Sequence, residues 1–141
     1  MEKTTVELGK GMSCTIRSRN HTYYSDEPTD KGGEDHGPMP MEMLLGALGS
    51  CVAITLRIYA DRKGWPLEGV KVAVDVQRFR GEEYEAYEGE AGFVHEFREA
   101  ITLEGPLTEE QKERLLDIAT KCPVRRAIEL PAFFKEMEGA Q

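Results

Sequence analysis

Two of the three cysteines, Cys51 and Cys122, are the residues whose type and setting could carry out chemistry. Cys51 ends an apolar run that begins at Met41, and Cys122 is followed directly by Pro123. A buried thiol reacts selectively with a peroxide when a nearby group stabilises its thiolate, and the sulfenic acid that forms needs a second thiol to capture it. The sequence therefore predicts thiol redox chemistry at these two cysteines.

Both cysteines could instead be packing residues of the core, and their spacing does not decide between packing and redox roles. On a helix of about 3.6 residues per turn, Cys51 shares an apolar face with Leu48 and Ile58. Burial in such surroundings raises the pKa of a thiol and leaves it unreactive. Cys122 fits one apolar stripe with Ile118, although its place at a helix end before a proline suits a segment that moves and brings its sulfur toward another.

The number and spacing of the cysteines argue against structural disulfides and metal sites. Three cysteines are too few for a disulfide framework, and none of them has CxxC spacing. The three histidines show no metal-ligand spacing with the cysteines, so no metal is expected, and no cofactor either. Cys14 alternates with Ile16 on a predicted strand, which indicates a packing role.

Length and composition indicate one globular domain over residues 1–141, with 40% hydrophobic and 31% charged residues. The net charge of -8 and the interspersed basic residues argue against nucleic acid as a partner. The first residues do not have the pattern of a signal peptide, so we expect a cytoplasmic protein. The apolar stretch 39–59 contains Glu42, Ser50 and Arg57, which favours a buried helix over a membrane span.

Alternation and turn residues predict an N-terminal hairpin with a third strand, followed by a solvated loop over residues 26–38 that is rich in Gly, Pro and charge. Pro40 predicts the start of a helix that ends at residue 63, before Gly64. This helix is apolar nearly all round, so it must be enclosed on most sides, and an intertwined dimer would enclose it. The expected N-terminal strands cover residues 4–8, 13–19 and 22–25.

The second half predicts a long antiparallel hairpin and a further helix. Valines alternate with polar residues over 70–80, residues 93–103 alternate more weakly, and a charged connection joins the two strands. The sequence Thr108-Glu109-Glu110-Gln111 is a capping box that starts a helix, and this helix should stop at Cys122 because a proline follows. Residues 127–134 are expected to form a short strand or an irregular segment.

These residues resemble one family. The sequence Gly37-Pro38-Met39-Pro40-Met41-Glu42-Met43-Leu44-Leu45, then Ala47-Leu48-Gly49-Ser50-Cys51, and finally Lys121-Cys122-Pro123-Val124, is similar to the OsmC/Ohr superfamily in order and spacing. The resemblance spans about residues 12–130. It implies an α+β, OsmC-like fold, in which antiparallel sheets pack around a long central buried helix and two chains interlock as an intertwined homodimer.

The resemblance also implies a thiol-dependent peroxidase. Cys51 matches the peroxidatic cysteine, which reduces an organic hydroperoxide to an alcohol, and Cys122 matches the cysteine that resolves its sulfenic acid as a disulfide. A dithiol reductant, a lipoylated protein in the Ohr branch, would complete the cycle. An apolar pocket favours alkyl or fatty-acid hydroperoxides, because burial of each methylene contributes about 0.8 kcal/mol.

In the family, an arginine from the N-terminal strands assists the peroxidatic cysteine, and a glutamate at the head of the central helix orients that arginine. The glutamate's slot in the Ohr branch is Met41 here, and Glu42 lies one residue later. On a straight helix Glu42 faces away from Cys51, so it would act through the arginine or in a partner's site. The preferred arginine is Arg17. Lys10 and Arg19 are the other candidates for this cation, while Arg125 and Arg126 are candidates for lowering the Cys122 pKa or for pairing across a dimer.

The motif style is closer to the OsmC-like branch than to Ohr itself, which leaves other functions open. A non-catalytic OsmC-like protein would bind a fatty or aromatic ligand in the dimer pocket while both cysteines stay reduced. A structural dimer module would have neither activity, but it would leave the two cysteines unexplained.

Overall fold

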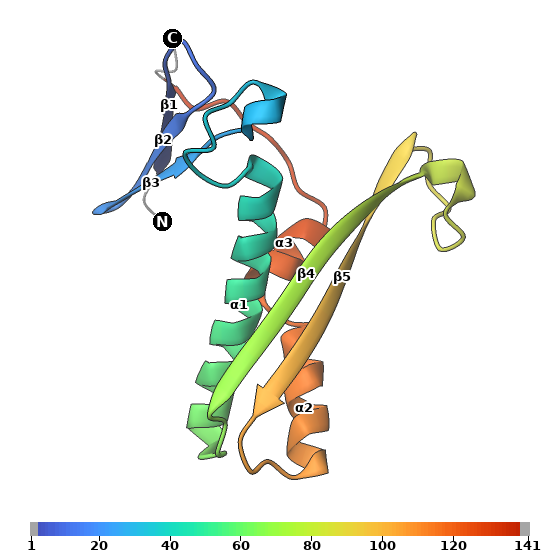
Figure 1. The fold of residues 1–141 in the computed structure, drawn as a ribbon. Helices are drawn as coiled ribbons and strands as arrows, with labels where there is room; N and C mark the ends of the chain where they lie inside the picture. The colour runs from blue at the N-terminus through green and yellow to red at the C-terminus, as the bar shows by residue number, and fades with distance from the viewer. Residues whose placement is uncertain (1–2, 139–141) are drawn as a thin grey trace. The chain divides into compact units, whose positions relative to one another are not determined.

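The computed structural model describes residues 3–138. Contacts between residues divide the chain into two compact units, residues 1–46 and 47–141, and each is described by itself. Both units contain antiparallel sheet, and the helix α1 begins in the first and continues through the second (Figure 1). The predicted α+β class is confirmed, while the single domain stays a prediction.

The N-terminal unit contains a three-stranded antiparallel sheet with the strand order β1-β2-β3. Its strands are β1 (Thr4–Leu8), β2 (Cys14–Ser18) and β3 (His21–Ser25). In the register of the first pair, Val6 lies opposite Ile16. Period-two alternation and the intervening turn residues thus predicted all three strands, with ends that differ by one residue at most.

The loop after β3 is largely exposed to solvent, as the sequence predicts, but it encloses one buried residue. It contains a short 3-10 helix, η1 (Thr29–Lys31), and it folds around Asp26, which is only 2% exposed. The Asp26 carboxylate accepts hydrogen bonds from the backbone N–H groups of Glu27, Glu34 and His36, at 2.7, 3.2 and 3.1 Å. The loop is therefore wrapped around a buried carboxylate, which hydropathy alone does not reveal.

The helix α1 (Pro40–Lys63) has the bounds that the sequence predicts. Pro40 occupies the first turn, where a missing N–H costs nothing, and Gly64 follows the last residue with a φ of 67°. By length and composition alone, α1 could cross a membrane, a test that the core helix of a soluble protein also passes. In the second unit, its residues Val52 and Leu56 are completely buried against other elements of the fold.

A long antiparallel hairpin and two helices make up the rest of the second unit. The hairpin consists of β4 (Gly69–Arg80) and β5 (Phe93–Glu104), joined by a connection that contains η2 (Gly81–Glu83). The helices are α2 (Glu109–Ala119), which starts at the predicted capping box of Thr108 and Gln111, and α3 (Pro123–Glu129). Figure 1 shows the hairpin running beside α1 and α2.

The core of this unit lies between one side of α1, the hairpin and α2. The helix packs against the hairpin at Gly49, where a Cβ would make an ordinary van der Waals contact, 3.4 Å from a methyl group of Val74. The opposite side of α1 is open in the single chain, where Ile54 and Ile58 are 59% and 48% exposed, and its enclosure by a second chain stays a prediction. The buried core residues are Leu48, Val52, Leu56, Ala60, Leu67, Leu107, Leu115, Ile118, Ala119 and Cys122.

The segment after Cys122 corrects another expectation. The sequence suggests a strand or an irregular segment over residues 127–134, but α3 continues to Glu129 and only the residues after it are irregular. The preceding helix α2 ends at Ala119, before the predicted stop at Cys122, and Cys122 has extended geometry next to Pro123, which is the first residue of a new helix.

Candidate thiol site

The structure brings the side chains of Cys51 and Cys122 together in the second unit. Cys51 comes from α1 and is half-buried, at the margin between the buried side and the exposed side of the helix. Cys122 lies at the start of α3 and has no exposed surface. The two thiols are close enough to share a hydrogen bond, so a contact joins residues that are far apart in the sequence.

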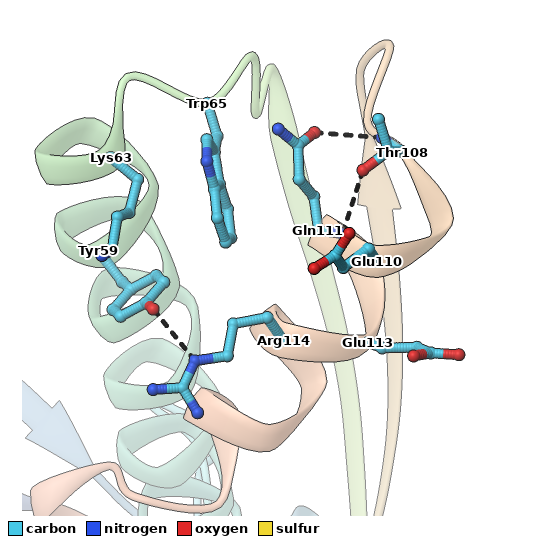
Figure 2. A pocket seen from close by; sticks show the side chains of 8 residues that line it. All are labelled: Tyr59, Lys63, Trp65, Thr108, Glu110, Gln111, Glu113 and Arg114. Carbon is cyan, nitrogen blue, oxygen red and sulfur yellow. Dashed lines mark hydrogen bonds between the residues drawn. The ribbon is translucent and has the colours of Figure 1, made fainter.

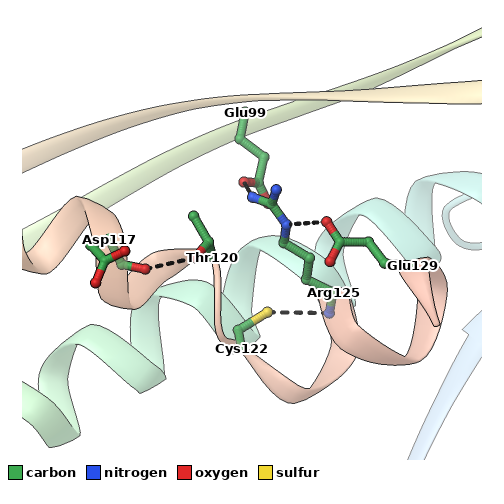
Figure 3. Close-up of polar contacts among 6 residues, drawn as sticks. All are labelled: Glu99, Asp117, Thr120, Cys122, Arg125 and Glu129. Carbon is green, nitrogen blue, oxygen red and sulfur yellow. Dashed lines mark hydrogen bonds and ion pairs between the residues drawn. The ribbon is translucent and has the colours of Figure 1, made fainter. Parts of the chain in front are cut away.

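The backbone around Cys122 holds its sulfur in place. The chain leaves α2 at Thr120, whose hydroxyl donates to the carbonyl of Asp117 at 2.7 Å. Cys122 then caps α3, and its Sγ accepts a hydrogen bond from the backbone N–H of Arg125 at 3.3 Å (Figure 3). Cys122, which the sequence analysis placed at a mobile helix end, is thus a buried residue whose sulfur caps the start of α3.

The surroundings favour the protonated form of Cys122. Burial raises the pKa of its thiol, and the hydrogen bond from the Arg125 N–H opposes this effect. The hydrogen bond with Cys51 and the negative charge of Glu99 add to the upward shift of the Cys122 pKa. The net direction is upward, so Cys122 is a poor thiolate in this environment.

An ion pair that the sequence analysis missed lies beside Cys122. The Arg125 guanidinium lies 3.2 Å from a carboxylate oxygen of Glu99 on β5, and it also contacts Glu129 at 2.7 Å (Figure 3). The Glu99 side chain is 12% exposed, and within residues 3–138 its Oε1 atom is buried without a hydrogen-bond partner. The strand's parity could have revealed Glu99, because it shares the inward-facing row of Phe97 and Ile101.

The other predicted site residues lie in the N-terminal unit. Arg17, on β2, forms an ion pair with Glu7 at 3.2 Å, and both side chains are largely exposed. The Glu42 carboxylate accepts a hydrogen bond from the backbone N–H of Met39 at 2.8 Å, which caps the start of α1. Within the described chain Glu42 forms no ion pair with Arg17, so the orienting role implied by the resemblance stays a prediction.

The alternatives to Arg17 as the activating cation, Lys10 and Arg19, lie in turns of the N-terminal sheet. Lys10 lies in the turn between β1 and β2, and Arg19 lies in the turn between β2 and β3 with a φ of 53°. Cys14 is half-buried on β2, with its thiol 3.9 Å from the carbonyl oxygen of Met12. Across residues 3–138, no cluster of three or more His, Cys, Asp or Glu side chains could hold a metal ion.

An open pocket of about 730 Å³ lies in the second unit, away from the cysteine residues. Tyr59 and Trp65 meet edge to face in its wall, and Arg114 donates a hydrogen bond to the Tyr59 hydroxyl at 3.0 Å (Figure 2). Lysine, arginine and glutamate side chains also line it. The lining is about half polar and carries several charged side chains, so the pocket differs from the apolar pocket that a fatty ligand requires.

Comparisons with known proteins agree with the fold. The family model described as OsmC-like protein matches residues 32–136, and no curated protein sequence matches the chain significantly. Among solved structures, an OsmC like protein from Mycoplasma pneumoniae is 22% identical, with a TM-score of 0.67 over 90% of this chain and 86% of that one.

Two further structures carry more specific names. The organic hydroperoxide resistance protein OsmC from Legionella pneumophila is 20% identical, with a TM-score of 0.65 over 92% of this chain and 90% of that one. The Organic Hydroperoxide Resistance Protein OhrB of Bacillus subtilis is 17% identical, with a TM-score of 0.62 over 90% and 89%. These similarities establish the shared fold, and the family match covers most of the sequence. The chain belongs to the OsmC-like protein family.

Proposed function

We propose that the chain is a thiol-dependent peroxidase, which reduces organic hydroperoxides to alcohols through Cys51 and Cys122. The observation that carries the proposal is the contact between these two thiols inside the second unit. Family membership and the names of the Legionella pneumophila and Bacillus subtilis structures support the same class of substrate.

In the first step, the Cys51 thiolate attacks the distal oxygen of the hydroperoxide. A sulfur–oxygen bond forms as the oxygen–oxygen bond breaks, and the departing alkoxide takes a proton to become the alcohol. Cys51 suits this role better than Cys122 because it is half-buried, whereas Cys122 has no exposed surface and a raised thiol pKa. Cys51 is thereby oxidised to the sulfenic acid.

In the second step, the Cys122 sulfur attacks the Cys51 sulfenic acid. A disulfide forms, and the sulfenic hydroxyl leaves with the Cys122 proton as water. A dithiol, such as a lipoylated protein, then reduces the disulfide by two exchange reactions and is itself oxidised. This cycle suits a reducing cytoplasm, where a disulfide between the two cysteines would be transient.

The activating cation can be assigned in two ways. Arg17, oriented by Glu42, follows the family resemblance, although Arg17 here contacts Glu7 and Glu42 caps α1. Arg125 is the second candidate, because its charge lies near the Cys122 thiol, which in turn contacts Cys51. An arginine in either place would favour a thiolate over a thiol.

A homodimer would complete the fold around α1. Ile54 and Ile58 are large apolar side chains that stay exposed on the side of the helix opposite the core. Burial of such side chains against a second copy would remove apolar surface from water and is the arrangement that the family resemblance implies. The same contact would supply an apolar surface for the carbon chain of the hydroperoxide.

One observation favours a second candidate function, a non-catalytic protein that binds an apolar ligand in the dimer pocket. The raised pKa of Cys122 is typical of a buried structural cysteine. In that case both thiols would survive contact with a peroxide, and the exposed apolar side of α1 would serve ligand binding alone.

Peroxide consumption by purified protein tests the proposal. Free thiols and cumene hydroperoxide are followed together after mixing, with a dithiol added afterwards. We expect a rapid loss of two thiols per chain, recovered by the dithiol, and no rapid peroxide loss with Cys51→Ser.

Two variants serve as controls for this measurement. Cys122→Ser is expected to consume one equivalent of peroxide and then stop, because its sulfenic acid has no resolving thiol. Cys14→Ser is expected to behave like the unmodified chain. Thiol loss no faster than that of free cysteine would instead favour the binding protein.

A further inference from the structure

Glu99 stands in an unusual place for a carboxylate. On β5 its neighbours in the inward-facing row are Phe97 and Ile101, both of which pack against the core. Charged side chains rarely take such positions unless a counter-charge accompanies them. The adjacent Arg98 has the ordinary arrangement, since it points outward and pairs with Asp75 at 2.7 Å.

The pairing of Glu99 is incomplete. One oxygen lies 3.2 Å from the Arg125 guanidinium, while Oε1 is buried and accepts no hydrogen bond within the described residues. Arg125 itself is shared with Glu129. A buried charge with one partner is poorly screened, so neighbouring groups experience its field more strongly than that of a surface carboxylate.

The groups around Cys122 come from each element of its surroundings. Cys51 approaches from α1, Glu99 acts from β5, and Arg125 and Glu129 come from α3. At the end of α2, Asp117 is engaged by Arg114 at 2.7 Å and by Lys121 at 3.6 Å, and the backbone carbonyl of Asp117 faces Thr120. Glu99 is thus the incompletely paired charge of this set.

We propose that Glu99 is a positioning residue that keeps the proton on Cys122, so that Cys51 is the sulfur of the pair that ionises and attacks the hydroperoxide. Arg125 holds the Glu99 carboxylate in place. Burial is the main cause of the raised pKa of the Cys122 thiol, and the charge of Glu99 acts in the same direction. The inference rests on the proposed peroxidase function and adds how two neighbouring thiols take different roles.

The assignment fits the proton balance of the cycle. While Cys51 attacks the peroxide, the Cys122 thiol stays protonated and can donate its hydrogen bond to the Cys51 sulfur. Once Cys51 is a sulfenic acid, the Cys122 proton leaves with the sulfenic hydroxyl as water, and the disulfide forms. The retained proton is therefore the one that the second step requires.

The test is an ultraviolet titration of the Cys122 thiolate. Cys14→Ser and Cys51→Ser are combined so that Cys122 is the single thiol, and thiolate absorbance is followed against pH. Addition of Glu99→Gln removes the negative charge and frees Arg125 to attract the thiolate. Both effects act in one direction, so the titration midpoint should fall by about one pH unit.

Glu129→Gln is the matched control, because it removes another carboxylate that contacts Arg125, but one whose side chain is 50% exposed. In the same background it should shift the midpoint by less than about 0.3 pH units. A midpoint that does not fall with Glu99→Gln, or falls equally with both substitutions, overturns the proposal. Glu99→Leu suits the apolar row and provides the same test if the glutamine variant does not fold.

A second readout follows the roles of the two sulfurs. Protein with only Cys14→Ser is treated with limiting cumene hydroperoxide and dimedone, and the labelled cysteine is identified by peptide mass spectrometry. The label should lie on Cys51, and Glu99→Gln should move part of it to Cys122. Label that stays confined to Cys51 in Glu99→Gln contradicts the role assignment, whereas unlabelled protein contradicts the peroxidase itself and leaves the titration result standing.

Discussion

Asp26 in the N-terminal unit and Glu99 in the second unit are both carboxylates with little exposed surface, but their surroundings differ. Both oxygens of Asp26 accept hydrogen bonds, from three backbone N–H groups in total. Glu99 has one ion pair and one oxygen without a partner within residues 3–138. A carboxylate whose two oxygens both accept hydrogen bonds is typical of a group that fixes the backbone. An incompletely paired carboxylate beside two thiols is better placed to influence their chemistry.

The largest expected effect is on the stability of the loop around Asp26. Asp26→Ala leaves the backbone N–H groups of Glu27, Glu34 and His36 without the buried acceptor that they share, and each lost hydrogen bond costs free energy. We expect the Tm to fall by about 5 to 10 °C in thermal unfolding followed by circular dichroism. The two ends of this loop also lie very close together at Gly33, where a Cβ would clash with the backbone carbonyl of Glu27. A Tm unchanged by Asp26→Ala would mean that these hydrogen bonds contribute little.

The acid dependence of stability sharpens the role of Asp26. Burial raises the pKa of Asp26, but the three backbone hydrogen bonds and the charge of His36 oppose it, and the net pKa is lowered. A lowered pKa in the folded state contributes stability above the unfolded pKa of about 3.9, which is lost as the pH falls through the folded value. Urea unfolding at pH 7 and pH 3 should therefore show a gap between the unmodified chain and Asp26→Asn that narrows at pH 3. A gap of equal size at both pH values would contradict this.

Glu99 should behave in the opposite way. Glu99→Leu replaces a half-paired buried charge with a side chain that suits Phe97 and Ile101, and such replacements are often neutral or stabilising. Arg125 keeps its contact with Glu129. We expect the Tm to change by less than about 3 °C, in the same circular dichroism experiment. A loss as large as that of Asp26→Ala would make Glu99 a structural residue and remove the contrast.

The smallest effect on the Tm is expected from Arg98, which lies next to Glu99 on the outer face of the hairpin. Arg98 forms a forked contact with Asp75, with both distances 2.7 Å, and this hydrogen bonding lowers the Asp75 pKa. Both side chains are half exposed, so solvent screens the pair. Arg98→Gln should change the Tm by less than about 2 °C. A larger change would show that this surface pair contributes as much as a buried one.

The sequence predicted the parts of the fold that depend on local periodicity. The valine alternation of β4 and the capping box of α2 are local signals, and the structure confirmed both. The burial of Asp26 could not be predicted, because it depends on the loop folding back toward the end of β3. The short helix α3 was missed because Pro123 was interpreted as a stop signal, although proline also favours the first position of a helix.

The candidate site was predictable in part. Cys51 and Cys122 followed from residue type and family resemblance, but their contact depends on the packing of α1 against the start of α3. The position of Glu99 could have been predicted, because on β5 it lies two residues from Phe97 and two from Ile101 and therefore faces the same side of the strand. Arg17 and Glu42 remain predictions, since their contacts within the N-terminal unit are with Glu7 and Met39.

The most direct test of the central claim is peptide mapping after oxidation by one equivalent of cumene hydroperoxide. The account predicts a single disulfide-linked peptide that joins Cys51 to Cys122, absent before treatment and removed by a dithiol. If both cysteines remain as free thiols while the peroxide persists, the two sulfurs do not act as a redox pair and the proposed peroxidase is wrong.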